Sequence, residues 1–176
     1  NSDVIFINKP SGMLSQKAKP EDVSLVEYLI AHLIHKGELN AGDLASFKPG
    51  ICNRLDRNTS GIVAAGKTTK GLQQLSEAFK QRILGKYYLC IVKGNVDKRA
   101  LIKGYLYKDN KTNKVTISRT ETKDSLPIET EYIPVCSNGN VTLLKIHLLT
   151  GRSHQIRAHL ASIGHPLIGD YKYGSQ

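Results

Sequence analysis

The segment NRLDRNTSGIVAAGKTT, residues 53–69, passes from a charged loop into an apolar run and then to a helix start. Residues 62–65 have the short, uninterrupted apolar composition of a buried strand. Thr69 is of a type that caps helices, and Gly85 is of a type that ends them. The apolar face of the predicted helix comprises Leu72, Leu75, Phe79 and Ile83. The segment therefore predicts a loop, a buried strand and a helix in succession.

The N-terminal side repeats the alternation of strand and helix. Residues 4–7 form a short apolar run that predicts a strand, and the turn sequence Asn-Lys-Pro-Ser-Gly follows it. Ser24 and Glu27 have the spacing of a capping box at the start of a helix, which Gly37 would close. Residues 38–60 are polar and rich in turn formers, so we expect a loop there.

The second half of the chain has the composition of a β-meander. Segments rich in β-forming residues recur with turn sequences between them, at 87–92, 101–107, 113–118, 128–135 and 141–149. A last helix is expected from Ser153 to Gly164. Because no internal repeat or linker is present, the sequence predicts one α+β domain over residues 1–176, built on a mixed, mostly antiparallel sheet flanked by helices.

The composition is that of one ordinary folded domain. The 176 residues are 40% hydrophobic and 23% charged, which is enough to bury a core and excludes a disordered polycation. No apolar run is long enough to span a membrane, and the N-terminus lacks the plan of a signal peptide. Three cysteines at irregular spacing fit neither a disulfide framework nor a zinc motif. We expect a cytoplasmic protein with reduced thiols and no membrane partner.

The excess of positive charge is concentrated in one stretch. The chain has 25 Lys and Arg against 15 Asp and Glu, and residues 80–119 contain eleven Lys and Arg against two Asp. A solvated lysine-rich face would account for such a surplus in many basic proteins. Its concentration among predicted hairpins favours a surface that follows the phosphates of a polyanion.

Residues 61–68, GIVAAGKT, match the pattern of a phosphate-binding loop, G-x-x-x-x-G-K-[ST]. That loop needs a strand before its first glycine and a flexible stretch between its glycines. Here polar residues precede Gly61, and the four residues between the glycines are themselves the apolar run. The sequence therefore argues against nucleotide hydrolysis.

Four of the six histidines lie within nineteen residues, which raises the question of a metal site. They are His147, His154, His159 and His165. His154 and His159 are five residues apart, about 140° around a helix, and no pair has the i, i+4 spacing of helical metal ligands. We predict no metal, and histidines that form hydrogen bonds or contact RNA.

Three blocks place polar residues inside strand-like or helical surroundings. They are NRLDRNTSG at 53–61, KYYL at 86–89 with Gly94, and TGRSHQIR at 150–157 continuing to GHPLIGD at 164–170. Asp56 lies between Arg54 and Arg57, and nearby cations favour an ionised carboxylate. That suits a nucleophile better than a general acid. Taken alone, the block is better explained by a structural Arg–Asp pair.

In this order and at these separations, the blocks resemble the signature of the pseudouridine synthases of the RluA family. The family's blocks are H-R-L-D-R-x-T-S-G, K-x-Y-x-x-x-V-x-G, and T-G-R-[ST]-H-Q-I-R followed by G-H-P-[IL]-x-G-D-x-x-Y-G. The turn Asn-Lys-Pro-Ser-Gly at 8–12 is similar to the family's opening N-K-P-x-G. The match runs from about residue 5 to residue 174.

The resemblance implies that Asp56 is the catalytic aspartate. It implies that Tyr88 stacks on the target base and takes part in proton transfer, and that Arg157 is the basic residue paired with the aspartate. Arg54 and Arg152 are motif arginines that we place around the site as RNA or scaffold contacts. The implied reaction detaches uracil at the N1–C1′ bond and rejoins it through C5, which needs no cofactor.

The implied partner is RNA, ribosomal large-subunit RNA most often and transfer RNA sometimes, bound by a monomer with the target base flipped out. We expect the catalytic domain alone over residues 1–176, trimmed at both ends and without an S4 RNA-binding domain. Asn53 stands where the family usually has His, and we expect it to support the loop. The alternative is a non-catalytic RNA-binding or ribosome-assembly protein, which would need no aspartate. A protein partner with an acidic patch would differ from RNA in the salt dependence of binding.

Overall fold

The computed structural model describes residues 1–174, which fall into two compact units. Unit 1 is Asn1–Leu84, and unit 2 begins at Gly85 and runs to the end of the chain. Each unit combines an antiparallel sheet with helices, so the predicted α+β class with mostly antiparallel strands is confirmed. The assignment of residues 1–176 to a single catalytic domain stays a prediction.

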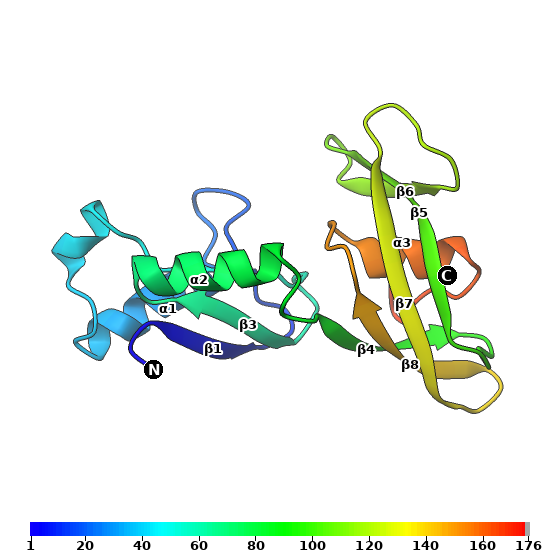
Figure 1. Ribbon diagram of the computed structural model, residues 1–176, viewed down its shortest axis with the longest axis horizontal. Helices are drawn as coiled ribbons and strands as arrows, with labels where there is room; N and C mark the ends of the chain where they lie inside the picture. Colours follow the sequence, from blue (N-terminus) through cyan, green and yellow to red (C-terminus); the bar gives the residue numbers. More distant parts are fainter. Residues whose placement is uncertain (175–176) are drawn as a thin grey trace. The chain divides into compact units, whose positions relative to one another are not determined.

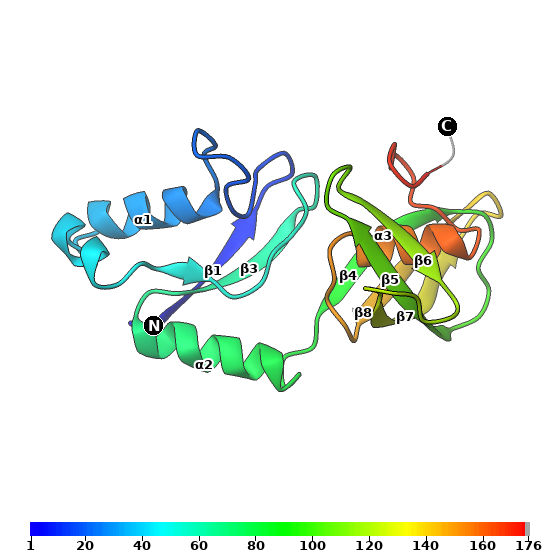
Figure 2. The same cartoon turned by 90° about the horizontal axis from the view of Figure 1, so that it is seen from above.

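Unit 1 has a three-stranded sheet between two helices. Its elements are β1 (Val4–Lys9), α1 (Leu25–His35), the 3₁₀ helix η1 (Ala41–Ala45), β2 (Gly50–Ile51), β3 (Gly61–Gly66) and α2 (Thr69–Lys80). The strand order is β1-β3-β2, and both pairings are antiparallel. Figure 2 shows α1 and α2 on either side of β1 and β3. The central strand β3 is therefore the most deeply buried part of the unit, with Val63 and Ala65 fully enclosed.

The helix starts follow the sequence closely. Ser24 and Glu27 form the predicted capping box of α1, and Gly37 has the positive φ of a helix-closing glycine. For α2 the cap is Thr68, not Thr69, because the Thr68 hydroxyl accepts a hydrogen bond from the Gly71 amide. The helix also ends earlier than predicted, at Lys80, since Arg82 takes a left-handed conformation and leaves Ile83 exposed.

Unit 2 has a five-stranded sheet and the helix α3, which Figure 1 labels. Its elements are β4 (Tyr87–Lys93), β5 (Ala100–Asp109), β6 (Lys114–Ser118), β7 (Leu126–Ser137), β8 (Val141–Leu148) and α3 (Gln155–Ser162). The strand order is β4-β8-β7-β5-β6, and all four pairings are antiparallel. All five predicted strands and the last helix are present, although α3 is shorter than the expected 153–164.

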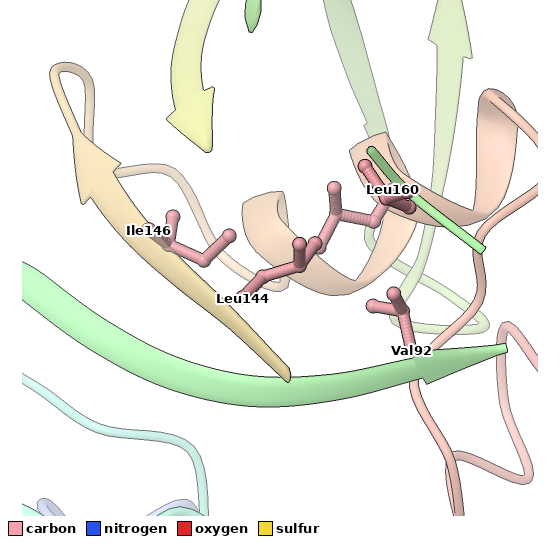
Figure 3. Close-up of a cluster of buried hydrophobic side chains, with 5 residues drawn as sticks. Val92, Leu144, Ile146 and Leu160 are labelled. Atoms are coloured by element: carbon pink, nitrogen blue, oxygen red, sulfur yellow. The ribbon is translucent and has the colours of Figure 1, made fainter. Parts of the chain in front are cut away.

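Helix α3 covers one face of this sheet and creates the core of unit 2. Leu160 of α3 meets Val92 of β4 and Leu144 and Ile146 of β8, all four with almost no exposed surface (Figure 3). Because successive side chains of a strand point to opposite faces, the neighbours of these residues point away from the helix. Leu89, three positions before Val92 and paired with Lys145 of β8, lies on that opposite face, and 69% of it is exposed.

Two features of the fold differ from the sequence-based prediction. The strands are divided between two sheets, whereas one was expected, and the expected loop at 38–60 contains η1 and the short strand β2. Strand β2 pairs with β3 through only two residues, which is too short a run to show a period in sequence. Within residues 1–174 no helix is long and apolar enough to cross a lipid bilayer.

A Leu→Ala substitution should lower the stability much more on the buried face of the unit 2 sheet than on the exposed face. Leu144→Ala removes a buried side chain from the core and should lower the free energy of unfolding by about 2–5 kcal/mol. Leu89→Ala, on the exposed face, should lower it by less than about 1 kcal/mol. Urea denaturation of both variants and the wild type tests this difference, and equal losses would contradict the assignment of the faces.

Candidate active site

Asp56 lies on a loop of unit 1 that joins β2 to β3 and is fastened at both ends. Before it, the Leu55 amide donates to Ser15 Oγ at 3.0 Å, and the Ser15 hydroxyl donates to the Leu55 carbonyl at 2.7 Å. After it, the Thr59 amide donates to the Asp56 carbonyl at 3.0 Å. Leu55 is buried while Asp56 is half-buried, so the loop turns its apolar residue inward and leaves Asp56 partly accessible.

Asn53 supports this loop from its base, as predicted. Its side-chain carbonyl accepts from the Ala64 amide at 2.8 Å, and its amide nitrogen donates to the Ile62 carbonyl at 3.1 Å. The side chain thus bonds to β3 as a further strand residue would. An asparagine side chain can form both hydrogen bonds, so the loop is anchored although Asn stands where the family usually has His.

The ammonium group of Lys9 is buried beneath the Asp56 loop. Lys9 has no exposed surface, and its Nζ donates to the carbonyls of Pro10 at 2.9 Å, Met13 at 2.8 Å and Arg57 at 3.2 Å. Burial lowers the pKa of Lys9 below its ordinary value, and the negative charge of Asp56 acts in the opposite direction. Lys9 is therefore both a brace for the loop and a cation beside the carboxylate.

Further bonds join the turn after β1 to the loop along its length. The Gly12 amide donates to the Arg57 carbonyl at 2.8 Å, and Arg57 Nε returns a bond to the Gly12 carbonyl at 3.1 Å. Gly12 has φ near +89°, a conformation that glycine adopts without strain. Ser11 Oγ donates to the Asn58 carbonyl at 2.9 Å. The Asn-Lys-Pro-Ser-Gly turn thus acts as a template for the segment that carries Asp56.

In unit 2, Tyr88 lies on β4, on the side of the sheet that α3 covers. It pairs with Ile146 and packs, half-buried, against the core formed by Val92, Leu144 and Leu160. Its ring is therefore held by the core at one edge of the sheet. Tyr87, its neighbour in sequence, points to the opposite face.

The block at 150–157 turns into α3 around the buried side chain of Gln155. Gln155 Oε1 accepts from the Thr150 hydroxyl at 2.9 Å and from the Arg152 amide at 3.0 Å. Its Nε2 donates to the Glu129 carbonyl at 3.1 Å and to Thr130 Oγ1 at 3.0 Å. One glutamine thereby holds the loop that presents Arg152, whose side chain is exposed.

His159 continues this network into the core. Its Nδ1 is 3.0 Å from Thr130 Oγ1, and because the ring also donates a hydrogen bond to the backbone of Lys103, the neutral ring accepts at Nδ1 from the Thr130 hydroxyl. Burial lowers the pKa of His159 to about 4, while a backbone hydrogen bond with Lys103 opposes the shift. His159 is therefore a neutral structural histidine. The other three clustered histidines also have hydrogen bonds, to Glu131, Tyr173 and the Lys93 carbonyl.

Arg157 forms a two-pronged ion pair with Asp170. Arg157 Nε and a terminal nitrogen lie 2.7 and 2.8 Å from the two carboxylate oxygens, and the ring of Tyr173 lies 5.2 Å from the guanidinium carbon. The pKa of Asp170 is lowered overall: burial raises it, but hydrogen bonds from Arg157 and from the amides of Lys172 and Tyr173 outweigh this. The pairing of Arg157 with Asp56 that the motifs imply stays a prediction.

The predicted site residues are thus distributed over both units. Asp56 and Arg54 share the loop of unit 1, while Tyr88, Arg152 and Arg157 belong to unit 2. Sequence reasoning did not single out Lys9, Gln155 or Asp170. All three lie in the motif blocks or in the Asn-Lys-Pro-Ser-Gly turn, but a motif does not state which of its residues face inward. His159 was predicted to form hydrogen bonds, and it does.

The segment that matches the phosphate-loop pattern forms a strand, as predicted from the sequence. Gly61–Gly66 is β3, with hydrogen-bonded partners on both sides, so its amides are not free to surround a phosphate. Among residues 1–174 no group of three or more His, Cys, Asp or Glu side chains is placed to hold a metal ion.

Comparison with known proteins supports the motif resemblance. The family model described as RNA pseudouridylate synthase matches residues 3–162 and therefore spans both units. Ribosomal large subunit pseudouridine synthase D of Borreliella burgdorferi is 34% identical over 177 residues, which cover 99% of this chain and 53% of that protein. An uncharacterized RNA pseudouridine synthase of Mycoplasma genitalium is 34% identical over 176 residues, 98% of this chain and 54% of the relative. The chain spans about half the length of these curated relatives.

Solved structures share the fold. Human RNA pseudouridylate synthase domain containing 4 superposes with a TM-score of 0.79 at 20% identity, over 99% of this chain and 67% of the human chain. Human RNA pseudouridylate synthase domain containing 1 gives 0.74 at 22% identity, over 98% and 66%. The fold expected from the resemblance is therefore confirmed.

Lys9→Met should destabilise unit 1 and loosen the Asp56 loop. Three carbonyls would lose a buried donor, and the expected loss is about 3 kcal/mol in the free energy of unfolding. Urea denaturation and amide hydrogen exchange at Gly12 and Leu55 measure the two effects. The matched control is Lys80→Met, at an exposed end of α2, where a change within about 0.5 kcal/mol is expected. Equal effects of the two substitutions would show that Lys9 does not brace the loop.

The stability of the protein should fall on mild acidification because of His159. Its pKa rises from about 4 in the folded chain to about 6.5 in the unfolded chain, so the unfolded state takes up the proton as the pH falls through that window. The expected loss between pH 7 and pH 5 is about 2 kcal/mol. Urea midpoints at both pH values test it in the wild type, in His159→Gln, which should lose most of the dependence, and in His35→Gln, which should retain it. An unchanged dependence in His159→Gln would contradict the prediction.

Proposed function

We propose, because the chain belongs to the RNA pseudouridylate synthase family, that it isomerises uridine to pseudouridine in RNA. The observation that carries the proposal is Asp56, the aspartate of the family motif, on a loop whose backbone is fastened by Ser15 and Lys9. A binding protein would need neither this carboxylate nor so rigid a support for it.

In the proposed reaction, Asp56 acts as nucleophile or electrostatic partner at C1′ of the ribose or C6 of the base. The N1–C1′ bond breaks, the uracil turns within the site, and a C5–C1′ bond forms. The proton displaced from C5 leaves to solvent, and N1 gains a proton. The reaction changes no oxidation state and transfers no group to another molecule, so its atoms balance without a cofactor.

The remaining predicted residues would act on the base and on the RNA chain. Tyr88, held at the edge of the core, offers an aromatic face to the flipped base and a hydroxyl for proton transfer. Arg157 would serve the carboxylate from α3, with Asp170 fixing its orientation. Arg54 and Arg152 are both exposed and suit phosphate contacts.

We propose RNA of the large ribosomal subunit as the substrate, and the cytoplasm as the location of a monomeric enzyme. The proposal rests on the name of the Borreliella burgdorferi relative and on the eleven basic residues between positions 80 and 119. Transfer RNA is the alternative substrate. A non-catalytic RNA-binding or ribosome-assembly role is the alternative function.

Asp56→Asn should abolish turnover while changing RNA affinity by less than about tenfold, or 1.4 kcal/mol. The substitution removes the negative charge but keeps the size of the side chain and its backbone contacts. The assay measures tritium released to water from ribosomal and transfer RNA labelled at C5 of uridine, since pseudouridine and uridine have the same mass.

The control is Asp97→Asn, which changes an exposed aspartate of unit 2 and should leave release unaffected. Release by the wild type and by Asp97→Asn, but not by Asp56→Asn, is the expected result, and the RNA that responds would identify the substrate class. Equal release by Asp56→Asn would defeat the assignment of Asp56. Binding without any release would favour the non-catalytic alternative.

A further inference from the structure

The face of the unit 2 sheet opposite α3 has an unusual set of exposed side chains. On β4 these are Tyr87, Leu89 and Ile91, which are 58%, 69% and 50% exposed. Their positions alternate with Tyr88, Cys90 and Val92, which face the core. Since a sheet with one buried face ordinarily carries polar residues on the other, this composition calls for an explanation.

This exposed face carries aromatic residues on three strands. The set consists of Tyr87 on β4, His147 on β8, and Tyr105 and Tyr107 on β5, and we call it the aromatic face. Directly opposite residues of paired strands share a face. Tyr87 is paired with His147, His147 with Glu131, and Glu131 with Leu101 of β5, which lies an even number of residues from Tyr105 and Tyr107.

The ring of Tyr87 is held in place and still accessible. It stacks on the His147 ring with centroids 4.5 Å apart and an angle of 15° between the planes. His147 Nδ1 is in turn 3.3 Å from Glu131, which also pairs with Arg99. Glycine at position 85 leaves room for the Tyr87 ring, because a Cβ there would lie 2.7 Å from a ring carbon. A ring that is already oriented loses little entropy when a base stacks on it.

Cations surround the aromatic face. The Lys145 ammonium lies 5.1 Å from the Tyr87 ring centroid, where it could meet the phosphate of a nucleotide stacked on that ring. Arg99 and Lys103, each with about two thirds of its side chain exposed, point from the β5 side and pair with Glu131 and Glu129. The strands β4, β5 and β6 also lie within the stretch that holds eleven basic residues against two acidic ones.

Aromatic rings placed among cations on an exposed sheet face form a surface that suits single-stranded RNA. Every base has a face that stacks on an aromatic ring, and the cations hold the phosphates between bases. A protein partner would need an acidic group to meet Lys145, and a purely apolar partner would cover that ammonium without a counterion. Charge and aromaticity together favour RNA over either.

We propose that the aromatic face binds a single-stranded RNA segment outside the target uridine, with one base stacked on Tyr87 and a phosphate on Lys145. The choice of RNA as partner rests on the proposed function, but the binding itself requires no isomerisation. The face lies on the opposite side of the sheet from Tyr88, so its occupant is a second part of the RNA chain.

The test uses a fluorescent twelve-residue oligoadenylate, which is single-stranded and contains no uridine to occupy a catalytic site. Fluorescence anisotropy measures its affinity for the wild type, Tyr87→Ala, Tyr87→Phe and Lys145→Gln. Tyr87→Ala should weaken binding about tenfold, within the range measured for the loss of one stacked base. Tyr87→Phe keeps the ring and should bind within twofold of the wild type. Lys145→Gln should lower the slope of log affinity against log salt by about one phosphate contact.

Tyr28→Ala is the matched control, because Tyr28 of α1 is 56% exposed and belongs to unit 1. It should leave the affinity for oligoadenylate unchanged. Equal affinities of Tyr87→Ala and the wild type would overturn the proposal, and so would an equal loss in Tyr28→Ala. Tighter binding of polyglutamate than of oligoadenylate, lost in Lys145→Gln, would assign the face to an acidic protein instead.

Failure of this proposal is distinguishable from failure of the proposed function. Tritium release depends on Asp56, whereas oligoadenylate binding depends on Tyr87. Tritium release together with oligoadenylate binding that does not need the Tyr87 ring would support the proposed function and contradict the second site. No tritium release together with binding that needs the ring would support the second site and contradict the proposed function.

Discussion

The buried ammonium of Lys9 is the constraint on which the geometry of unit 1 depends. A charge without solvent contact is unfavourable unless its hydrogen bonds are made, and Lys9 meets this condition with carbonyls from two separate segments. Because one of those carbonyls belongs to Arg57, the ammonium fixes the residue after Asp56 as well as its own turn. The carboxylate is thus positioned by a group that sequence places 47 residues away.

In unit 2, neutral buried groups hold the motif loop in place, where unit 1 uses a buried charge. Gln155 and His159 face inward from α3 and join β7 to the loop before the helix through Thr130. Among the described residues, no buried side-chain nitrogen or oxygen lacks a hydrogen-bond partner. A network in which every member is satisfied specifies one arrangement, since any displacement leaves a buried polar atom unpaired. Both loops that carry motif residues are therefore defined by buried polar contacts more than by apolar packing.

Local signals in the sequence predicted the elements well, because capping and periodicity are local. Ser24 and Glu27 marked the start of α1, and the apolar run at 62–65 marked β3. The division into two sheets could not be predicted, because strand pairing depends on contacts between segments far apart in sequence. The same limit applies at the site. The motif blocks contain both Arg157 and Asp170, but sequence alone does not show that these two side chains pair.

The distribution of charge separates two requirements that an RNA-modifying enzyme must meet. Affinity for RNA comes from many cations acting over a surface, and it tolerates the loss of any one of them. Chemistry on one base needs a single group held at one place. Here the stretch at 80–119 carries nearly the whole net charge and builds three strands of unit 2, whereas Asp56 is fastened to the sheet of unit 1. Under the proposed function, different residues meet the two requirements, so substitutions are expected to alter RNA affinity and turnover independently, which is the physical basis for assigning each by mutation.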